Sequence, residues 1–200
     1  SRSTVIKHII GLINDADSLV GLSLPAGLVP VVEDALRAAV DRDVLVLALV
    51  FQSRTGSTTV DDVSLEGAAH VVREREVERT ILLTIDDGSA LVSSRGVITR
   101  PDSPATAISF DRPYFQNVVF KSLINTEWVN ATERYAASPA PLPTTYTTFR
   151  RAAIDAVLHN EAGRSVEARI EARPTDRPEA TGHLEGVVTR VDQRLGGPTT

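Results

Sequence analysis

The chain has 200 residues, of which 42% are hydrophobic and 24% charged, a balance that excludes an intrinsically disordered protein and suits one domain or two small ones. It contains no cysteine, which excludes a disulfide framework, a thiolate nucleophile and a metal site built on sulfur. The net charge of −5 argues against a surface that binds nucleic acid, because such surfaces need an excess of lysine and arginine.

The first residues of the chain and the length of its apolar runs indicate how the protein arises and where it is located. The sequence contains no methionine and begins with Ser1, so we expect it to be an excised fragment or a processed product. No apolar run reaches the roughly 18 residues that a membrane helix needs, and the start does not have the pattern of a signal peptide. We therefore expect a cytoplasmic protein with no membrane partner.

The first quarter of the sequence predicts alternating helices and strands. Apolar residues recur at helical spacing over residues 4–16 and 29–40, and residues 18–24 predict a short strand. Residues 43–51 form a continuous apolar run with β-branched members, which is typical of a strand buried on both faces of a parallel sheet. A strand, a helix and a second strand follow in order, so this region predicts the βαβ unit of an α/β layer.

A β-hairpin is the clearest local pattern in the middle of the chain. Residues 80–85 and 90–94 are apolar strands on either side of a turn at 86–89, and Asp-Gly is a preferred sequence for such turns. The further elements expected here are strands at 68–73 and 106–110 and a helix at 113–125. The apolar face expected for that helix comprises Phe115, Val118, Val119, Leu123 and Ile124.

Three prolines in residues 138–143 mark the expected domain boundary. We therefore divide the chain into a first domain, residues 1–137, and a second, residues 138–200. The second is expected to begin with a helix at 144–160, with Tyr146, Phe149, Ala153, Ala156 and Val157 on one face. Antiparallel strands at 165–172 and 184–191 follow, in a sheet that we expect to be cut short after Thr200.

The sequence contains few patterns that point to catalysis. None of the four histidines has a partner at metal-ligand spacing, so we predict no metal site. The nucleophile-elbow, dinucleotide and Walker phosphate-loop motifs are all absent, and we predict no catalytic residue and no cofactor. Asp86 and Asp87 could act as acid and base or bind a cation, but the hairpin turn explains them better.

Two other places have side chains that suit a ligand. Trp128, the only tryptophan, stands near polar residues and suits either the apolar face of a sugar or a core anchor. Glu171 lies on one predicted strand and Gly186 on the next, where a strand glycine often marks close approach to a ligand. Carboxylates on an outer, solvated strand face are the alternative.

The hairpin sequence TILLTIDDGSALVSS resembles the strand–turn–strand of the phospholipase-D-like fold, whose active members carry His-x-Lys-x4-Asp. With the aspartate placed on Asp86, the histidine and lysine positions fall on Arg79 and Ile81. With Asp87 they fall on Thr80 and Leu82, so neither alignment keeps the nucleophile. The resemblance implies the fold without its catalysis.

Residues 114–163, followed by VEARIEARP and GHLEGVVTRV, resemble haloarchaeal members of the TrmB family of sugar-responsive transcriptional regulators. Members of that family begin with a winged-helix DNA reader and a dimerising helix. A catalytically dead phospholipase-D-like domain follows, and a small β domain binds sugar together with it. The resemblance implies the α/β fold class, with a phospholipase-D-like α/β sandwich followed by a small antiparallel β domain.

The resemblance further implies an effector-sensing, homodimeric part of a transcriptional regulator that is not an enzyme. Its effector would be a sugar or a related small molecule, and DNA would be bound only through a winged helix that we expect to be missing here. The positions corresponding to the family's sugar contacts, with Trp128 added from its own pattern, are Ser93, Ser94, Trp128, Glu171, Gly186 and Asp192. A ligand-free interaction module and a phosphodiesterase relic are the alternatives.

Overall fold

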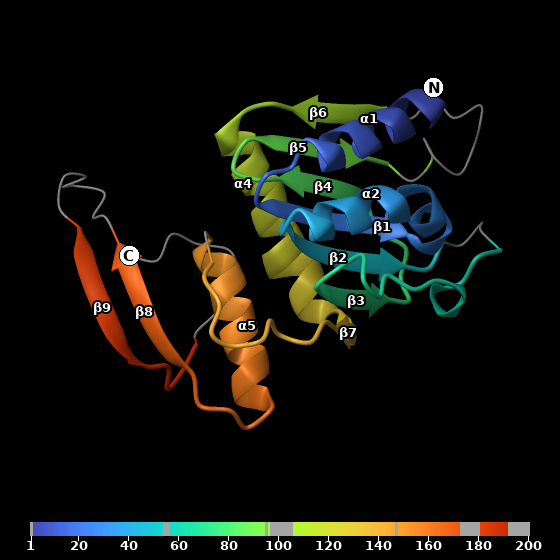
Figure 1. Cartoon of the computed structure of the whole chain (residues 1–200). Helices are drawn as coiled ribbons and strands as arrows, with labels where there is room; N and C mark the ends of the chain where they lie inside the picture. Colours follow the sequence, from blue (N-terminus) through green and yellow to red (C-terminus); the bar gives the residue numbers. More distant parts are fainter. Residues whose placement is uncertain are drawn as a thin grey trace. The chain divides into compact units, whose positions relative to one another are not determined.

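The computed structural model describes residues 2–53, 57–94, 96, 106–146, 148–172 and 181–191. The chain forms two compact units, of which the first reaches Ala137 and the second begins at Ser138 (Figure 1). Within the described ranges, no helix combines the length and the apolar character that a membrane span requires.

The first unit is built on a mixed seven-stranded sheet with the strand order β6-β5-β4-β1-β2-β3-β7. Its strands are β1 (Leu19–Pro25), β2 (Leu45–Phe51), β3 (Val71–Arg75), β4 (Ile81–Ile85), β5 (Ser89–Ser93), β6 (Ala107–Phe110) and β7 (Thr132–Ala136). Strands β1, β2 and β3 run parallel, and the other pairings are antiparallel. Every residue of β1 and β2 is buried, which confirms the strand predicted at 43–51 as covered on both faces and shows that the short strand predicted at 18–24 is covered in the same way.

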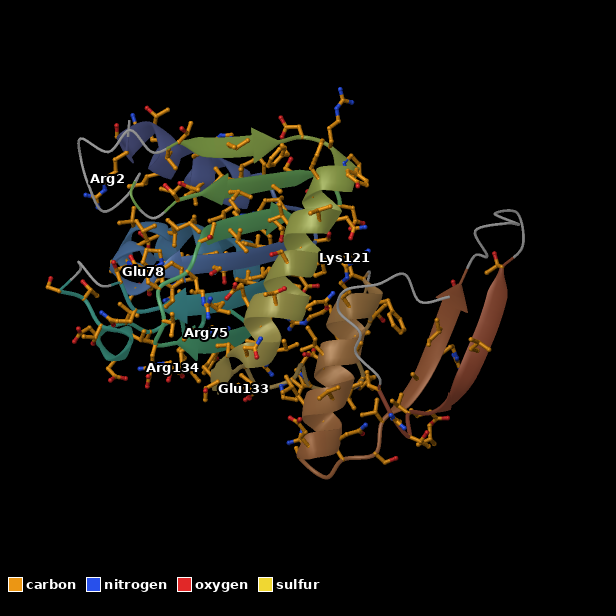
Figure 2. The ribbon with its side chains drawn as sticks, turned by 180° about the vertical axis from the view of Figure 1, so that it is seen from behind. Arg2, Arg75, Glu78, Lys121, Glu133 and Arg134 are labelled. Carbon is orange, nitrogen blue, oxygen red and sulfur yellow. The ribbon has the colours of Figure 1, made fainter. Side chains whose placement is uncertain are left out.

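Helices cover both faces of this sheet (Figure 1). Helices α1 (Arg2–Asn14) and α2 (Val29–Asp41) lie on one face, with the short turn η1 (Ala26–Leu28) between β1 and α2. The other face carries α4 (Pro113–Ser122), the π-helical turn η3 (Leu123–Glu127) and the 3-10 turn η4 (Trp128–Asn130), as Figure 2 shows from behind. A further 3-10 turn, η2 (Val60–Asp62), lies between β2 and β3.

Gly21 allows η3 and the neighbouring strand to lie close to β1. A Cβ atom at this position would lie 2.7 Å from Thr84 Oγ1 and 3.2 Å from Leu123 Cδ2. Thr84 also donates a hydrogen bond of 3.2 Å to the Gly21 carbonyl, so the hydroxyl has a fixed place. Glycine is therefore required here for close packing rather than for an unusual backbone angle.

Strand β7 was not expected from the sequence, and β3 starts at Val71 instead of residue 68. The β7 sequence TERYA has no apolar run, because the strand lies at the sheet edge with its first three residues exposed. It pairs with β3 through an irregularity between Val72 and Arg73. Such bulges are common at sheet edges and are not visible in sequence periodicity.

The apolar face predicted for the helix at 113–125 is partly wrong. Phe115 and Val118 are exposed, whereas Gln116 and Phe120 are buried together with Val119. The buried face is rotated because the Gln116 side-chain amide donates a hydrogen bond of 2.6 Å to the Asp86 carbonyl. A satisfied amide can replace an apolar side chain in a core, which periodicity alone does not reveal.

The second unit contains α5 (Phe149–Glu161) and a hairpin of β8 (Glu167–Ala172) with β9 (Gly182–Val187). The helix starts at Phe149 instead of residue 144, and Tyr146 precedes it. Its predicted face is also wrong, because Phe149 is exposed and the buried residues are Ile154, Asp155 and His159. Strand β9 starts two residues earlier than predicted and ends at Val187.

Hydrogen bonds to the segment before α5 explain that polar interior. The Asp155 carboxylate accepts bonds from the Tyr146 hydroxyl at 2.6 Å and the Ala140 backbone at 3.2 Å. His159 Nε2 lies 3.0 Å from the Ala140 carbonyl, and its Nδ1 lies 3.4 Å from an Arg164 guanidinium nitrogen. A neutral ring that donates from Nε2 and accepts at Nδ1 satisfies both contacts.

Candidate functional site

Open α/β sheets bind ligands at the carboxyl ends of their parallel strands, and we call this side of the sheet its carboxyl edge. Strand β4 runs antiparallel to β1, and Ile81 at its start pairs with Ser93 at the end of β5. Both therefore lie at the same edge as the ends of β1, β2 and β3. The hairpin thus positions the predicted Ser93 and Ser94 at this edge.

The two serines differ in their surroundings. Ser93 is buried, and its hydroxyl donates a hydrogen bond of 3.1 Å to the Ser94 carbonyl. Ser94 follows the strand and is exposed. Of the pair, only Ser94 offers a hydroxyl to solvent or to a ligand in this arrangement.

Trp128 lies in η4 with 6% of its surface exposed. The Arg73 guanidinium is 5.2 Å from its ring centroid and donates a hydrogen bond of 2.8 Å to its carbonyl. Arg73 belongs to β3, and the steps β5–β4–β1–β2–β3 place it four strands from Ser93. Four strand spacings are about 19 Å, so the fold does not bring Trp128 next to the serines.

The other predicted residues belong to the second unit. Glu171 is exposed on β8, with its carboxylate 3.8 Å from Nδ1 of His183 on β9. Gly186 is exposed on β9, and a Cβ atom built there would meet nothing within 4 Å. Asp192 lies outside the described residues.

A partly buried group of charged side chains, which the sequence did not predict, lies on the sheet face beneath η3, with the Arg79 side chain 31% exposed. We call it the arginine–glutamate cluster, and it consists of Arg75, Arg79 and Glu127. Glu127 Oε2 lies 3.6 Å from Arg75 Nη1 and 3.2 Å from Arg79 Nε. Arg75 is the last residue of β3, and Figure 2 views the face on which it lies. The side chains of Arg75 and Glu127 are only 15% and 16% exposed.

The cluster is incompletely hydrogen-bonded. Arg79 Nε and Glu127 Oε2 are buried and lie 3.2 Å apart as an ion pair, but among the described residues neither atom makes a hydrogen bond of good geometry. Arg75 Nη1 donates a long bond of 3.5 Å to the Glu127 carbonyl. Among the described residues, two guanidinium groups thus share one carboxylate, which leaves a net charge of +1. The only signal in the sequence was the alternation of arginines in VVRER, which is equally typical of a solvated strand.

Asp86, the aspartate of the hairpin motif, directly follows β4 and lies beside the start of β1. It is therefore at the opposite end of the strands from Ser93. Its carboxylate accepts hydrogen bonds from the backbone of Asp17, Ser18 and Leu19 and from the Ser18 hydroxyl, at 2.7–3.1 Å. Burial alone would raise the pKa of Asp86, but these bonds together hold the pKa below its usual value. The carboxylate therefore anchors the start of β1.

The positions that correspond to the catalytic histidine and lysine have other roles. Arg79 is paired with Glu127, and Ile81 is buried in β4. In the alternative alignment, Thr80 is exposed and Leu82 is buried. The strand–turn–strand is present, and neither alignment supplies the imidazole that covalent phosphodiester cleavage needs.

A family model described as "Transcriptional regulator TrmB, EBD N-terminal subdomain" matches residues 1–135. The chain belongs to the TrmB family of transcriptional regulators. This finding confirms the resemblance drawn from the sequence. The match covers all strands of the seven-stranded sheet except the last residue of β7.

Solved structures confirm the predicted fold class. Nuc from Salmonella typhimurium, a phospholipase D family member, superposes with a TM-score of 0.52 at 14% identity, over 66% of this chain and 90% of Nuc. TrmBL2, described as an archaeal chromatin protein, superposes with a TM-score of 0.52 at 18% identity. That match covers 67% of this chain and 51% of TrmBL2, so the chain spans about half of it. No curated protein sequence matches significantly.

Proposed function

We propose that the chain is the effector-sensing and dimerising part of a cytoplasmic transcriptional regulator. It binds a sugar or a related small molecule and thereby modulates DNA binding by a winged-helix domain of the same regulator. The observation that carries this proposal is the TrmB family match over residues 1–135. An effector that binds one dimer arrangement more tightly shifts the equilibrium between arrangements, which changes DNA affinity.

The proposed sugar contacts lie in both units. Ser94 directly follows β5 at the carboxyl end of the parallel strands, and Glu171 and Gly186 lie on the exposed hairpin. Carboxylates and hydroxyls suit a ligand rich in hydroxyl groups, and a strand glycine permits close backbone approach. We propose that residues 138–200 begin the sugar-binding β domain and that Asp192 is a further contact, whereas Trp128, which is 6% exposed, serves as a core anchor.

A Glu171→Gln chain is expected to bind its sugar at least tenfold more weakly. Hydrogen bonds from hydroxyls to a carboxylate are worth about 1.5–3 kcal/mol, and 1.4 kcal/mol corresponds to a factor of ten. The measurement is calorimetric titration of a panel of mono- and disaccharides. Glu167→Gln is the matched control, because it lies on the same strand and is also exposed. Equal affinity in both variants would remove Glu171 from the site.

We also propose that the chain has no phosphodiesterase activity. Arg79 and Ile81, or Thr80 and Leu82, occupy the positions of the histidine and lysine. The Asp86 carboxylate accepts its hydrogen bonds from the start of β1, at the other edge of the sheet from Arg79. A reaction through a histidine intermediate therefore has no nucleophile at the expected position.

Dimerisation without a ligand is the second candidate function, and one surface favours it. The outer side of α4 exposes Tyr114, Phe115 and Val118, and Phe115 stacks on Phe110 of β6 with ring centroids 5.0 Å apart. Ile108 on the same edge strand is exposed too. Contiguous exposed apolar side chains of this kind often mark protein–protein contacts, here with a second copy of the chain.

A Val118→Glu chain is expected to sediment as a monomer, whereas the unmodified chain sediments as a dimer. A charge buried in an apolar interface costs several kcal/mol, of order 3 or more, which is enough to dissociate an ordinary dimer. Analytical ultracentrifugation measures the mass. Val77→Glu is the control, since Val77 is 57% exposed and Val118 is 52% exposed. A monomeric unmodified chain, or the same loss in both variants, would contradict this role for α4.

A further inference from the structure

We infer that the arginine–glutamate cluster is a binding site for a compact anion, such as the phosphate group of a phosphorylated small molecule. In the absence of ligand, the Glu127 carboxylate occupies the place that the anion would take between Arg75 and Arg79. The inference deepens the proposed function, on which it rests for the biological identity of the ligand. It adds the chemical class of the effector and the residues that recognise it.

The charge of the cluster supports an anion. Two guanidinium groups have five N–H donors each, and their contacts among the described residues go to Glu127 alone. The two guanidinium groups carry a charge of +2, and the single Glu127 carboxylate neutralises half of it. A phosphate oxygen pair matches the planar fork of arginine, so phosphate can bind both groups through paired hydrogen bonds.

The internal contacts of the cluster are poor. The ion pairs to Glu127 are 3.6 and 3.2 Å long, and within the described residues neither Arg79 Nε nor Glu127 Oε2 makes a hydrogen bond of good geometry. Buried charged atoms in native structures usually have well-aligned hydrogen bonds, so this geometry needs an explanation. An anion with several acceptor oxygens would satisfy donors that a single carboxylate does not reach.

The position of the cluster is the third argument. Arg75 ends β3 at the carboxyl edge of the parallel strands, where ligands bind in open α/β sheets. Glu127 is the last residue of the π-helical turn η3, and such turns are frequent at functional sites. Rotation of this one side chain would open the site without any change in the sheet.

Arg134, in the same unit, is an arginine whose charge is fully balanced by carboxylates. Its guanidinium donates bonds of 2.9 Å to Asp61 and 2.7 Å to Glu74, so one cation faces two carboxylates. This group has a net charge of −1 and should repel an anion. It therefore provides a matched control within the same sheet.

Titration of inorganic phosphate into the 200-residue chain, followed by calorimetry at constant ionic strength set with chloride, tests the inference. We expect saturable binding to the unmodified chain and at least tenfold weaker binding to Arg79→Gln. Glu127→Gln should bind phosphate about tenfold more tightly, because it removes the competing carboxylate. Arg134→Gln should bind like the unmodified chain. Circular dichroism on each variant confirms that the chain is folded.

The sign of the Glu127→Gln effect separates this site from a purely structural bridge. If Glu127 only fastens η3 to β3, its loss destabilises the first unit and creates no tighter phosphate binding. Should Glu127→Gln be unfolded, the Arg79→Gln comparison decides, since that variant keeps a neutral Arg75–Glu127 pair. Absence of saturable phosphate binding in the unmodified chain, or equal weakening in Arg134→Gln, overturns the inference.

The same titrations distinguish failure of this inference from failure of the proposed function. Binding of a neutral sugar with no phosphate binding would overturn the anion site and leave the effector role intact. In the opposite outcome, the unmodified chain binds phosphate, Arg79→Gln does not, and no sugar or sugar phosphate gives a response. This result would support the anion site and overturn the proposal that the effector is a sugar.

Discussion

An Asp155→Ala chain is expected to lose the fold of the second unit while the first unit stays folded. Asp155 is 2% exposed and accepts hydrogen bonds from Tyr146 and Ala140. Its Oδ2 also lies 3.5 Å from Nε of Arg151, whose side chain is 11% exposed. Removal of the carboxylate would leave this guanidinium buried without a counter-ion, a defect that costs about 3–5 kcal/mol.

The consequence is large because the second unit is small. It has one described helix and one described hairpin, and small units bury too little surface to absorb such a loss. Asp155 also binds the backbone of Ala140 to α5, so the substitution would release this segment from the helix.

Hydrogen exchange and tryptophan fluorescence separate the two units. Trp128 is the only tryptophan and lies in the first unit, so its urea transition reports on that unit alone. We expect this transition to be unchanged in Asp155→Ala, while peptides from residues 149–172 lose their protection in mass-spectrometric exchange. Glu161→Ala, at an exposed site of the same helix, is the control. Full protection of residues 149–172 in Asp155→Ala would show that the carboxylate has no structural role.

The second large effect is expected from Asp86→Ala, which should destabilise the first unit by about 2–3 kcal/mol. The substitution removes the acceptor for three backbone N–H groups and one hydroxyl at the start of β1. Unsatisfied, partly buried donors cost about 1–3 kcal/mol, and bonds to a charged acceptor lie in the upper part of the range. The turn conformation adds to the effect, because Asp86 has a φ of +49°.

This contribution should depend on pH in a defined direction. The folded-state pKa of Asp86 is lower than its ordinary value, so its stabilisation is complete above the ordinary value and is lost as the pH falls through the folded pKa. The unmodified chain should therefore lose stability on acidification below about pH 4 more steeply than Asp86→Ala does.

Urea titrations followed by Trp128 fluorescence, at pH 7 and at steps from pH 5 to pH 3, measure this difference. The gap between the unmodified chain and Asp86→Ala should narrow as the pH falls. Asp34→Ala, at an exposed position of α2, should show the same acid dependence as the unmodified chain. A gap that stays constant over this pH range would show that Asp86 acts without its charge.

Local sequence patterns predicted the centre of the sheet and its edge strand β6, but missed the other edge strand, β7. The apolar runs of β1 and β2 and the hairpin of β4 and β5 determine their own conformation, since their burial is nearly uniform. Strand β7 is polar and mostly exposed, and its pairing with β3 depends on a partner far away in the sequence. Such long-range pairing leaves no periodic signal.

The two misassigned helix faces have one physical cause. Gln116 in α4, and Asp155 and His159 in α5, are polar residues that are buried because each has a hydrogen-bond partner on another segment. Apolar periodicity treats these residues as outward-facing. Only the fold shows that their partners make burial favourable.

The candidate site was predictable to the same limited extent. The family resemblance predicted Ser93 and Ser94, and the register of the hairpin places them at the carboxyl ends of the parallel strands. The arginine–glutamate cluster was not predictable, because Arg75 and Glu127 are 52 positions apart and meet only when η3 crosses the sheet.

Calorimetric titration of the unmodified chain measures directly whether these 200 residues bind a small effector. Each neutral sugar of a panel would be compared with its monophosphate at constant ionic strength. We expect saturable heat from at least one sugar and tighter binding of its phosphorylated form. No saturable heat from any member, with a chain that circular dichroism shows to be folded, would contradict this expectation.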